Sequence, residues 1–116
     1  MENFNLVNTK TLNLKELQSK VVAWRQYNFP NANSDSQLKG VMEELGELVH
    51  ADLKESQGIR QQDYYSAKVD SVGDMIIFLL NYCEMNNIDF EVAVRTAWNE
   101  ACVRDWIQFP KNGRTE

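Results

Sequence analysis

Histidine, cysteine and proline are scarce in this chain. Its 116 residues include one histidine, two cysteines and two prolines. A single His50, without any Cys-x-x-Cys or Cys/His pairing, excludes the common zinc centres. Cys83 and Cys102 each fall on the apolar side of an expected helix. We therefore expect two reduced, buried thiols in a cytoplasmic protein.

Long apolar runs are also missing. The longest one, 75–80, is far too short to cross a bilayer, and residues 1–14 lack the apolar segment of a signal peptide. Acidic residues outnumber basic ones by 17 to 12, which gives a net charge of −5. That charge argues against a nucleic-acid polymer as partner. The composition predicts one globular domain over 1–116, with no membrane and no nucleic acid as partner.

Helical periodicity dominates the rest of the chain. Apolar residues recur every three or four positions, and no segment alternates convincingly like a strand. The pattern predicts an all-α chain with a four-helix-bundle-like core, which oligomerisation completes because a chain of this size has a thin core. The expected helices span about 14–27, 35–57, 62–85 and 90–105, between an N-terminal arm, 1–12, and a non-helical tail, 106–116.

Turn-forming and capping residues mark the ends of these helices. Asn13 and Asp89 are expected N-caps, either Ser34 or Asp35 is expected to cap the second helix, and Gly58 is expected to end it. The apolar stripes of the second and fourth helices are expected to face the core. Their members are Leu38, Val41, Met42, Leu45, Leu48 and Val49, and Val92, Val94, Ala97, Trp98, Ala101 and Cys102.

Two acidic clusters are the most informative pattern. They are Glu43-Glu44-x-x-Glu47 on the second helix and Asp70-x-x-x-Asp74 on the third. Spacings of three or four place carboxylates on one helix face. Two such helices packed antiparallel would bring the clusters together, and like charges that close require a cation. Carboxylate oxygens suit Mg²⁺ or Mn²⁺.

The helical wheel separates the three glutamates. Glu44 and Glu47 share one side of the second helix with Gly40 and Ala51, whose small side chains leave room for a ligand. Glu43 lies further round, so we expect it to support the site from outside or to face solvent. The simpler interpretation is a set of solvated carboxylates with no bound ion.

The third helix places its acids beside the most apolar segment of the chain. Asp74 and Asn81 bracket that segment, and a buried carboxylate without a compensating charge costs several kcal/mol, roughly. The Glu47-Leu-Val-His50 pattern is typical of di-iron bundles. Those sites need two such motifs, which a chain with one histidine cannot supply.

At these residues the chain resembles the MazG-like members of the all-α nucleoside triphosphate pyrophosphohydrolases. The family pattern is ExxE on one helix and ExxD on the next. Here the first is Glu44-Leu-Gly-Glu47, and the second ends on Asp74, with Ser71 where the family has an acid. Asp70 lies one residue earlier. The similarity extends over roughly 24–113 and includes SQGIR, TAWNEACVRDW and FPKNG.

The resemblance implies hydrolysis of a nucleoside triphosphate, often a deoxynucleoside triphosphate, to the monophosphate and pyrophosphate. It implies that Glu44, Glu47, Asp70 and Asp74 hold Mg²⁺ or Mn²⁺ ions, with Glu44 and Glu47 catalytic and Glu47 placed to orient or deprotonate a water. Homodimers or homotetramers with active sites near the subunit interfaces are also implied. The alternative function is a catalytically silent helical module that binds a nucleotide or a partner helix.

Further candidates would bind the rest of such a substrate. Arg104 and Lys111, with Arg60 behind them, would hold phosphates, although each is equally a plain exposed cation. Asn81 offers a donor and an acceptor to a base or sugar edge. The aromatic residues that could stack on a base, or simply fill the core, are Trp24, Phe29, Trp98 and Trp106.

Overall fold

The computed structural model describes residues 11–114 and contains four α-helices. They are α1 (Leu14–Asn28), α2 (Ser34–Gln57), α3 (Tyr64–Met85) and α4 (Phe90–Ala101). No strand occurs among the described residues, so the predicted all-α class is confirmed. None of the helices in this part of the chain is long and apolar enough to cross a membrane.

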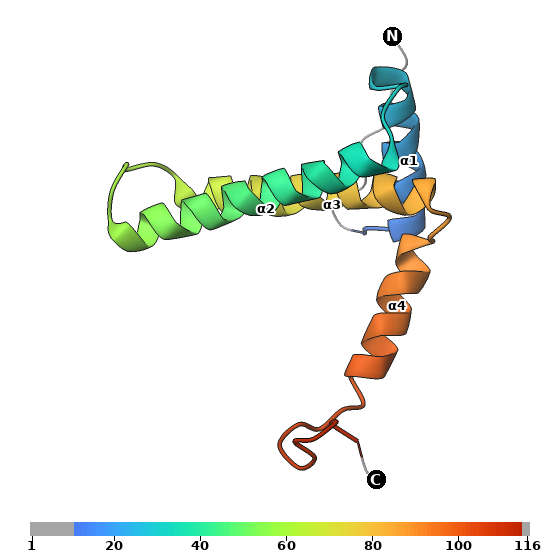
Figure 1. Ribbon diagram of the computed structural model, residues 1–116, viewed down its shortest axis with the longest axis vertical. Coiled ribbons are helices and arrows are strands. Elements are labelled where there is room, and N and C mark those ends of the chain that lie inside the picture. The colour runs from blue at the N-terminus through green and yellow to red at the C-terminus, as the bar shows by residue number, and fades with distance from the viewer. Residues whose placement is uncertain (1–10, 115–116) are drawn as a thin grey trace.

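The helices form an open arrangement around one hairpin. α2 and α3 run antiparallel side by side, and α1 lies across one end of that hairpin. α4 follows α3, contacts α1, and extends away from the hairpin (Figure 1). The packing of these helices gives a bundle-like core. Its most buried apolar side chains are Val21, Leu80 and Cys83, near the crossing of α1 and α3, and Ala51, further along α2.

Polar caps fix the ends of the helices. Asn13 Oδ1 accepts a hydrogen bond from the Glu16 N–H, as expected of the cap of α1. The prediction for α2 is wrong by one or two residues, because Asn33 caps it in a reciprocal pair with Ser36. Gly58 ends α2 with a φ of 69°, the left-handed conformation that favours glycine.

The face of α2 that is buried differs from the apolar stripe. The buried residues are Gln37, Gly40, Glu44 and Ala51, whereas most of the predicted stripe is exposed. The prediction that this stripe faces the core of the chain is therefore wrong for Leu38, Met42, Leu45 and Val49. The small residues Gly40 and Ala51 are among those buried, and they allow the two helices to approach closely.

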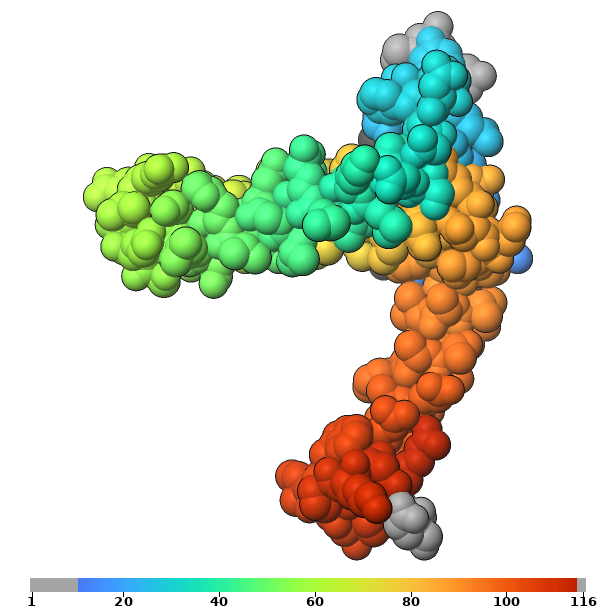
Figure 2. Space-filling model, viewed as in Figure 1, coloured from blue at the N-terminus to red at the C-terminus, as the bar shows by residue number. Residues whose placement is uncertain are grey.

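The prediction that an apolar stripe of the fourth helix faces the core is also wrong. α4 ends at Ala101, and none of its residues is buried within the chain. Cys102, expected in the core, is exposed, whereas Cys83 is buried as predicted and its burial raises the pKa of its thiol. The described part of the tail, 106–114, is non-helical as expected. The space-filling view shows α4 and the tail projecting away from the hairpin (Figure 2).

Gly40 lies where the Phe78 side chain of α3 packs directly on α2. A Cβ atom built there would lie 2.3 Å from Cδ1 of Phe78, well inside van der Waals contact. Phe78 lines the wall of a cavity described below. Glycine at position 40 therefore lets the aromatic ring lie against the α2 backbone.

We expect Gly40→Ala to lower stability by about 1–3 kcal/mol, because the ring must move to accommodate the methyl group. Gly46→Ala is the matched control, since nothing lies within 4 Å of its built Cβ atom. That change should stabilise the same helix by about 0.5–1 kcal/mol. Thermal melting of the two variants checks this, and equal effects would contradict the role of Gly40.

Candidate active site

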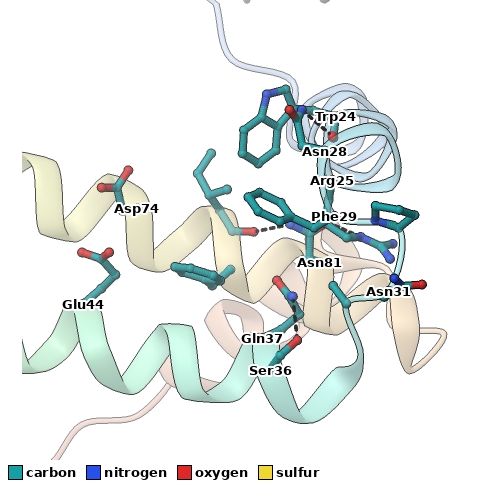
Figure 3. A pocket seen from close by; sticks show the side chains of 14 residues that line it. Trp24, Arg25, Asn28, Phe29, Asn31, Ser36, Gln37, Glu44, Asp74 and Asn81 are labelled. Atoms are coloured by element: carbon teal, nitrogen blue, oxygen red, sulfur yellow. Dashed lines mark hydrogen bonds between the residues drawn. The ribbon is translucent and has the colours of Figure 1, made fainter.

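Glu44 is a buried carboxylate at the centre of the α2–α3 hairpin. Its residue is 7% exposed, and its Oε2 atom has no hydrogen-bond partner among the described residues. An unpaired buried oxygen of this kind is costly unless a proton or a cation satisfies it. Figure 3 shows the Glu44 carboxylate turned toward that of Asp74 on α3.

The surroundings of Glu44 raise its pKa above the ordinary value of 4.5. Burial is the largest cause, followed by the negative charge of Glu47, a hydrogen bond with the Glu47 side chain, and the charges of Asp74 and Glu43. All of these favour the protonated form. A divalent cation would have the opposite effect, because it would favour the ionised carboxylate.

The three glutamates of α2 lie together. One carboxylate oxygen from each of Glu43, Glu44 and Glu47 can be chosen so that all three atoms lie within 4.8 Å of one another. Glu43 is therefore closer to the other two than the helical wheel indicated. Among residues 11–114, none of the acids in the two clusters takes part in an ion pair, since the nearby Lys39 and Lys68 bind other carboxylates.

The two aspartates of α3 lie at neighbouring hollows. Asp74 and Glu44 line a cavity of about 770 Å³, which reaches toward α1. Asp70 lines a second hollow of about 510 Å³, together with Glu43, Glu47 and His50. Asp74 thus shares a cavity with Glu44, and Asp70 shares the other with Glu43 and Glu47. Among the described residues, neither aspartate belongs to the group of close carboxylate oxygens that the three glutamates form.

Ser71 lies in the second hollow and is itself buried. Asp70, one residue earlier, lines the same hollow, so the helix keeps a carboxylate on this side of the site.

Aromatic and amide side chains form the rest of the larger cavity. Trp24 and Phe29 make an edge-to-face contact at its α1 end, with ring centroids 5.9 Å apart. Phe78 and Ile77 add apolar surface. The polar residues that line the cavity are Arg25, Asn28, Asn31, Ser36, Gln37 and Asn81. A cavity of this size, with apolar walls and a few placed polar groups, is typical of a small-molecule site.

A hydrogen-bonded chain holds Asn81 in this wall. Asn81 is 2% exposed, and its Nδ2 donates to the carbonyl of Ile77. Its Oδ1 accepts from Arg25 Nε at 3.3 Å, and Arg25 Nη2 donates to Glu84 Oε2 at 2.9 Å. Arg25 therefore fixes which end of the Asn81 amide accepts and which end donates.

The predicted phosphate-binding cations lie elsewhere. Arg104 stacks over the ring of Trp106, 5.8 Å from its centroid, in the segment after α4. This segment, which also carries Lys111, lies far from the hairpin in both views (Figures 1 and 2). Arg60 lies in the α2–α3 loop, with a φ of 56°. The fold of one chain does not bring Arg104 and Lys111 to the acids.

The sequence interpretation missed Arg25 and Gln37. Arg25 lies four residues after Val21 and therefore on the core-facing side of α1. A charged residue at such a position was a signal that could have identified Arg25 as part of the site. Gln37 precedes Gly40 and Glu44 on the same side of α2, and this polar stripe pointed to it. Of the proposed aromatic residues, Trp24 and Phe29 reach the cavity, whereas Trp98 and Trp106 do not line it.

Comparisons with known proteins add no assignment. No protein-family model, no curated protein and no solved structure matches this chain. The functional argument therefore depends on the residues of the site itself.

The raised pKa of Glu44 predicts a pH-dependent stability. Glu44 keeps its proton at a higher pH in the folded chain than in the unfolded chain. Without metal, its contribution to the free energy of unfolding therefore falls as the pH rises from about 4.5 through the raised pKa. Glu44→Gln should remove this slope. Mg²⁺ should raise the melting temperature of the parent protein most at the higher pH values, and should not do so in the variant.

Thermal melts from about pH 4 to about pH 8, in EDTA and in Mg²⁺, check both statements. Glu55→Gln on the same helix is the control, because Glu55 pairs with Lys68 outside the site. Melting curves of the parent protein that are the same in EDTA and Mg²⁺ at every pH would contradict a metal site at Glu44.

Proposed function

We propose that this protein hydrolyses a nucleoside triphosphate, with a deoxynucleoside triphosphate as the first candidate, to the monophosphate and pyrophosphate. The observation that carries the proposal is buried Glu44, whose Oε2 atom has no hydrogen-bond partner among residues 11–114. Its carboxylate is turned toward Asp74 in an aromatic-walled cavity (Figure 3). The resemblance of the two acidic motifs to the MazG-like pyrophosphohydrolases supports the same reaction.

The donor set fits divalent magnesium or manganese. Glu44, Glu47, Asp70 and Asp74 would hold the ions, and Glu43 would supply a further oxygen, because its carboxylate lies with those of Glu44 and Glu47. Bound there, the ions would neutralise phosphate charge and lower the pKa of a water molecule. Oxygen ligands from carboxylates are the set that these hard cations prefer.

The chain's own residues position the other reactants. The cavity is large enough for a nucleoside, and the rings of Trp24, Phe29 and Phe78 offer apolar surface to a base. Asn81 and Gln37 present amide groups to its polar edge or to the sugar. The triphosphate would then extend toward Glu44 and Asp74, with Glu47 placed to orient or deprotonate the attacking water.

A silent binding module is the second candidate. Two observations favour it: Ser71 stands in place of an acid, and Arg104 and Lys111 lie away from the site in one chain. Such a module would bind nucleotide in the same cavity without turnover.

The test of the proposed function is a panel of the standard nucleoside and deoxynucleoside triphosphates with Mg²⁺, with the products separated by ion exchange. We expect monophosphate and pyrophosphate, and a loss of at least about 100-fold in turnover for Glu44→Gln, because removal of one ligand carboxylate costs several kcal/mol of charge stabilisation. Glu55→Gln should keep the parent rate.

Other products would change the conclusion. Diphosphate and inorganic phosphate would mean a different phosphohydrolase. Nucleotide binding by calorimetry without any product, in Mg²⁺ and in Mn²⁺, would favour the silent module.

Arg25 gives a second prediction about this site. Arg25→Leu should raise KM about tenfold or more and leave kcat nearly unchanged, because a charge-assisted hydrogen bond that fixes Asn81 is lost. Asn81→Ala should have a similar effect, and the double variant should be little worse than either, since both act through one contact. Additive losses in steady-state kinetics would contradict this arrangement.

A further inference from the structure

The Gln37 side chain presents a buried oxygen to the larger cavity. Gln37 is 5% exposed and lines that cavity, and among the described residues its Oε1 atom accepts no hydrogen bond. Glu44 Oε2 is the one fully enclosed polar side-chain atom without a partner in residues 11–114, so Gln37 Oε1 is open to the cavity. An acceptor on a buried side chain is costly to leave unpaired, and a ligand that donates to it removes that cost.

The orientation of this amide is fixed by its neighbour. Gln37 Nε2 donates to Ser36 Oγ at 3.2 Å. The Ser36 hydroxyl has one hydrogen, which it donates to the Asn33 carbonyl at 2.8 Å, and its oxygen also accepts from the Asn33 N–H. Ser36 can therefore only accept from Gln37. The amide nitrogen faces Ser36, and the amide oxygen lies on the side away from it (Figure 3).

Asn81 is a second amide of fixed orientation in the wall of the same cavity. Its Oδ1 accepts from Arg25 Nε, and its Nδ2 donates one hydrogen to the Ile77 carbonyl. Because a guanidinium only donates and a carbonyl only accepts, this amide cannot flip, and one hydrogen of Nδ2 is left for a ligand. The cavity thus combines a fixed acceptor from Gln37 on α2 with a spare N–H from Asn81 on α3.

Both amides lie two helical turns from the acids. Gln37 comes seven residues before Glu44, and Asn81 comes seven residues after Asp74. Because α2 and α3 run antiparallel, both steps lead in the same direction along the hairpin, by about 10 Å. Figure 3 shows the two acids at one end of the cavity and the two amides toward the other. A nucleotide with its phosphates at the acids would meet the amides with the tip of its base, which is the part farthest from the phosphates.

We infer that Gln37 and Asn81 select a nucleobase with an exocyclic amine at its tip, which is cytosine or adenine. This inference rests on the proposed function, because it takes a nucleotide as the ligand. The amine of either base can donate to Gln37 Oε1, and the unprotonated ring nitrogen beside the amine can accept from Asn81 Nδ2.

The keto bases present the reverse pattern. In uracil, thymine, guanine and hypoxanthine a carbonyl oxygen replaces the amine at the tip, and the ring nitrogen beside it carries a hydrogen. The carbonyl oxygen would face the Gln37 oxygen, and the ring N–H would face the spare N–H of Asn81. Acceptor would meet acceptor and donor would meet donor, so these bases are disfavoured by two contacts.

Calorimetry with non-hydrolysable α,β-imido analogues in Mg²⁺ tests the inference on the parent protein. The analogues form two pairs, those of dCTP and dUTP and those of dATP and dITP, and each pair exchanges an amine for a carbonyl. In the pair that binds more tightly, the amino member should bind at least about tenfold more tightly than the keto member. Equal affinities, a preference for the keto member, or no binding of any analogue would overturn the inference.

Two variants test the role of the Gln37 oxygen. Gln37→Met removes the acceptor and keeps the length of the side chain, so it should weaken binding of the amino member and reduce the preference to less than about threefold. Ser36→Ala should also reduce the preference, because the amide can then flip and offer Nε2 to a carbonyl. Gln57→Met, at the exposed end of α2, is the matched control and should keep the parent preference. A preference that Gln37→Met retains in full would overturn the inference.

These titrations also separate the inference from the proposed function. A preference for amino bases without turnover of the natural triphosphates would contradict the hydrolase and support the base selection. Turnover without any difference between the amino and keto analogues would support the hydrolase and overturn the base selection.

Discussion

The close approach of α2 to α3 is the constraint on which the rest of the structure depends. Gly40 allows the Phe78 ring to lie against the α2 backbone, and Ser71 and Ala51 keep the contact narrow further along. A small-residue contact of this kind places Glu44 between two helices, where its carboxylate is nearly buried. It also turns the larger apolar residues of both helices outward. The buried acidic site and the exposed apolar residues of α2 and α3 therefore both follow from the way these two helices pack.

The burial of the Glu44 carboxylate has an electrostatic cost, and that cost indicates a functional role for the residue. Natural proteins rarely bury a carboxylate without a partner, because the ionised form loses its hydration and the protonated form keeps an oxygen unsatisfied. Here the carboxylates of Glu47 and Asp74 increase the cost and raise the pKa of Glu44 further. Such an arrangement is stable only if a cation or a proton resides there, and perturbed acids in a cavity are typical of functional sites.

The sequence predicted the helices well and the faces of the helices less well. Caps such as Asp89 and a stop such as Gly58 act locally, so their chemistry could be recognised without the fold. Helical spacing also predicted that the two acidic clusters lie near each other, and Glu44 and Asp74 line one cavity. Which stripe of α2 meets α3 could not be predicted, because both an apolar row and a small polar row have the correct period, and the pattern alone favours the apolar one. The Arg25–Asn81 contact joins residues 56 positions apart, so local periodicity gave no indication of it.

The most direct test of the central claim is a titration of the protein with Mn²⁺ near neutral pH, in which the free ion is measured by electron paramagnetic resonance. A site built on Glu44 should bind Mn²⁺ saturably in the parent protein, and Mg²⁺ should compete for it. Glu44→Gln should lose most of that binding, whereas Glu55→Gln should retain it. Identical titrations for the parent protein and Glu44→Gln would contradict the account, because the buried carboxylate would then have no role in holding a cation.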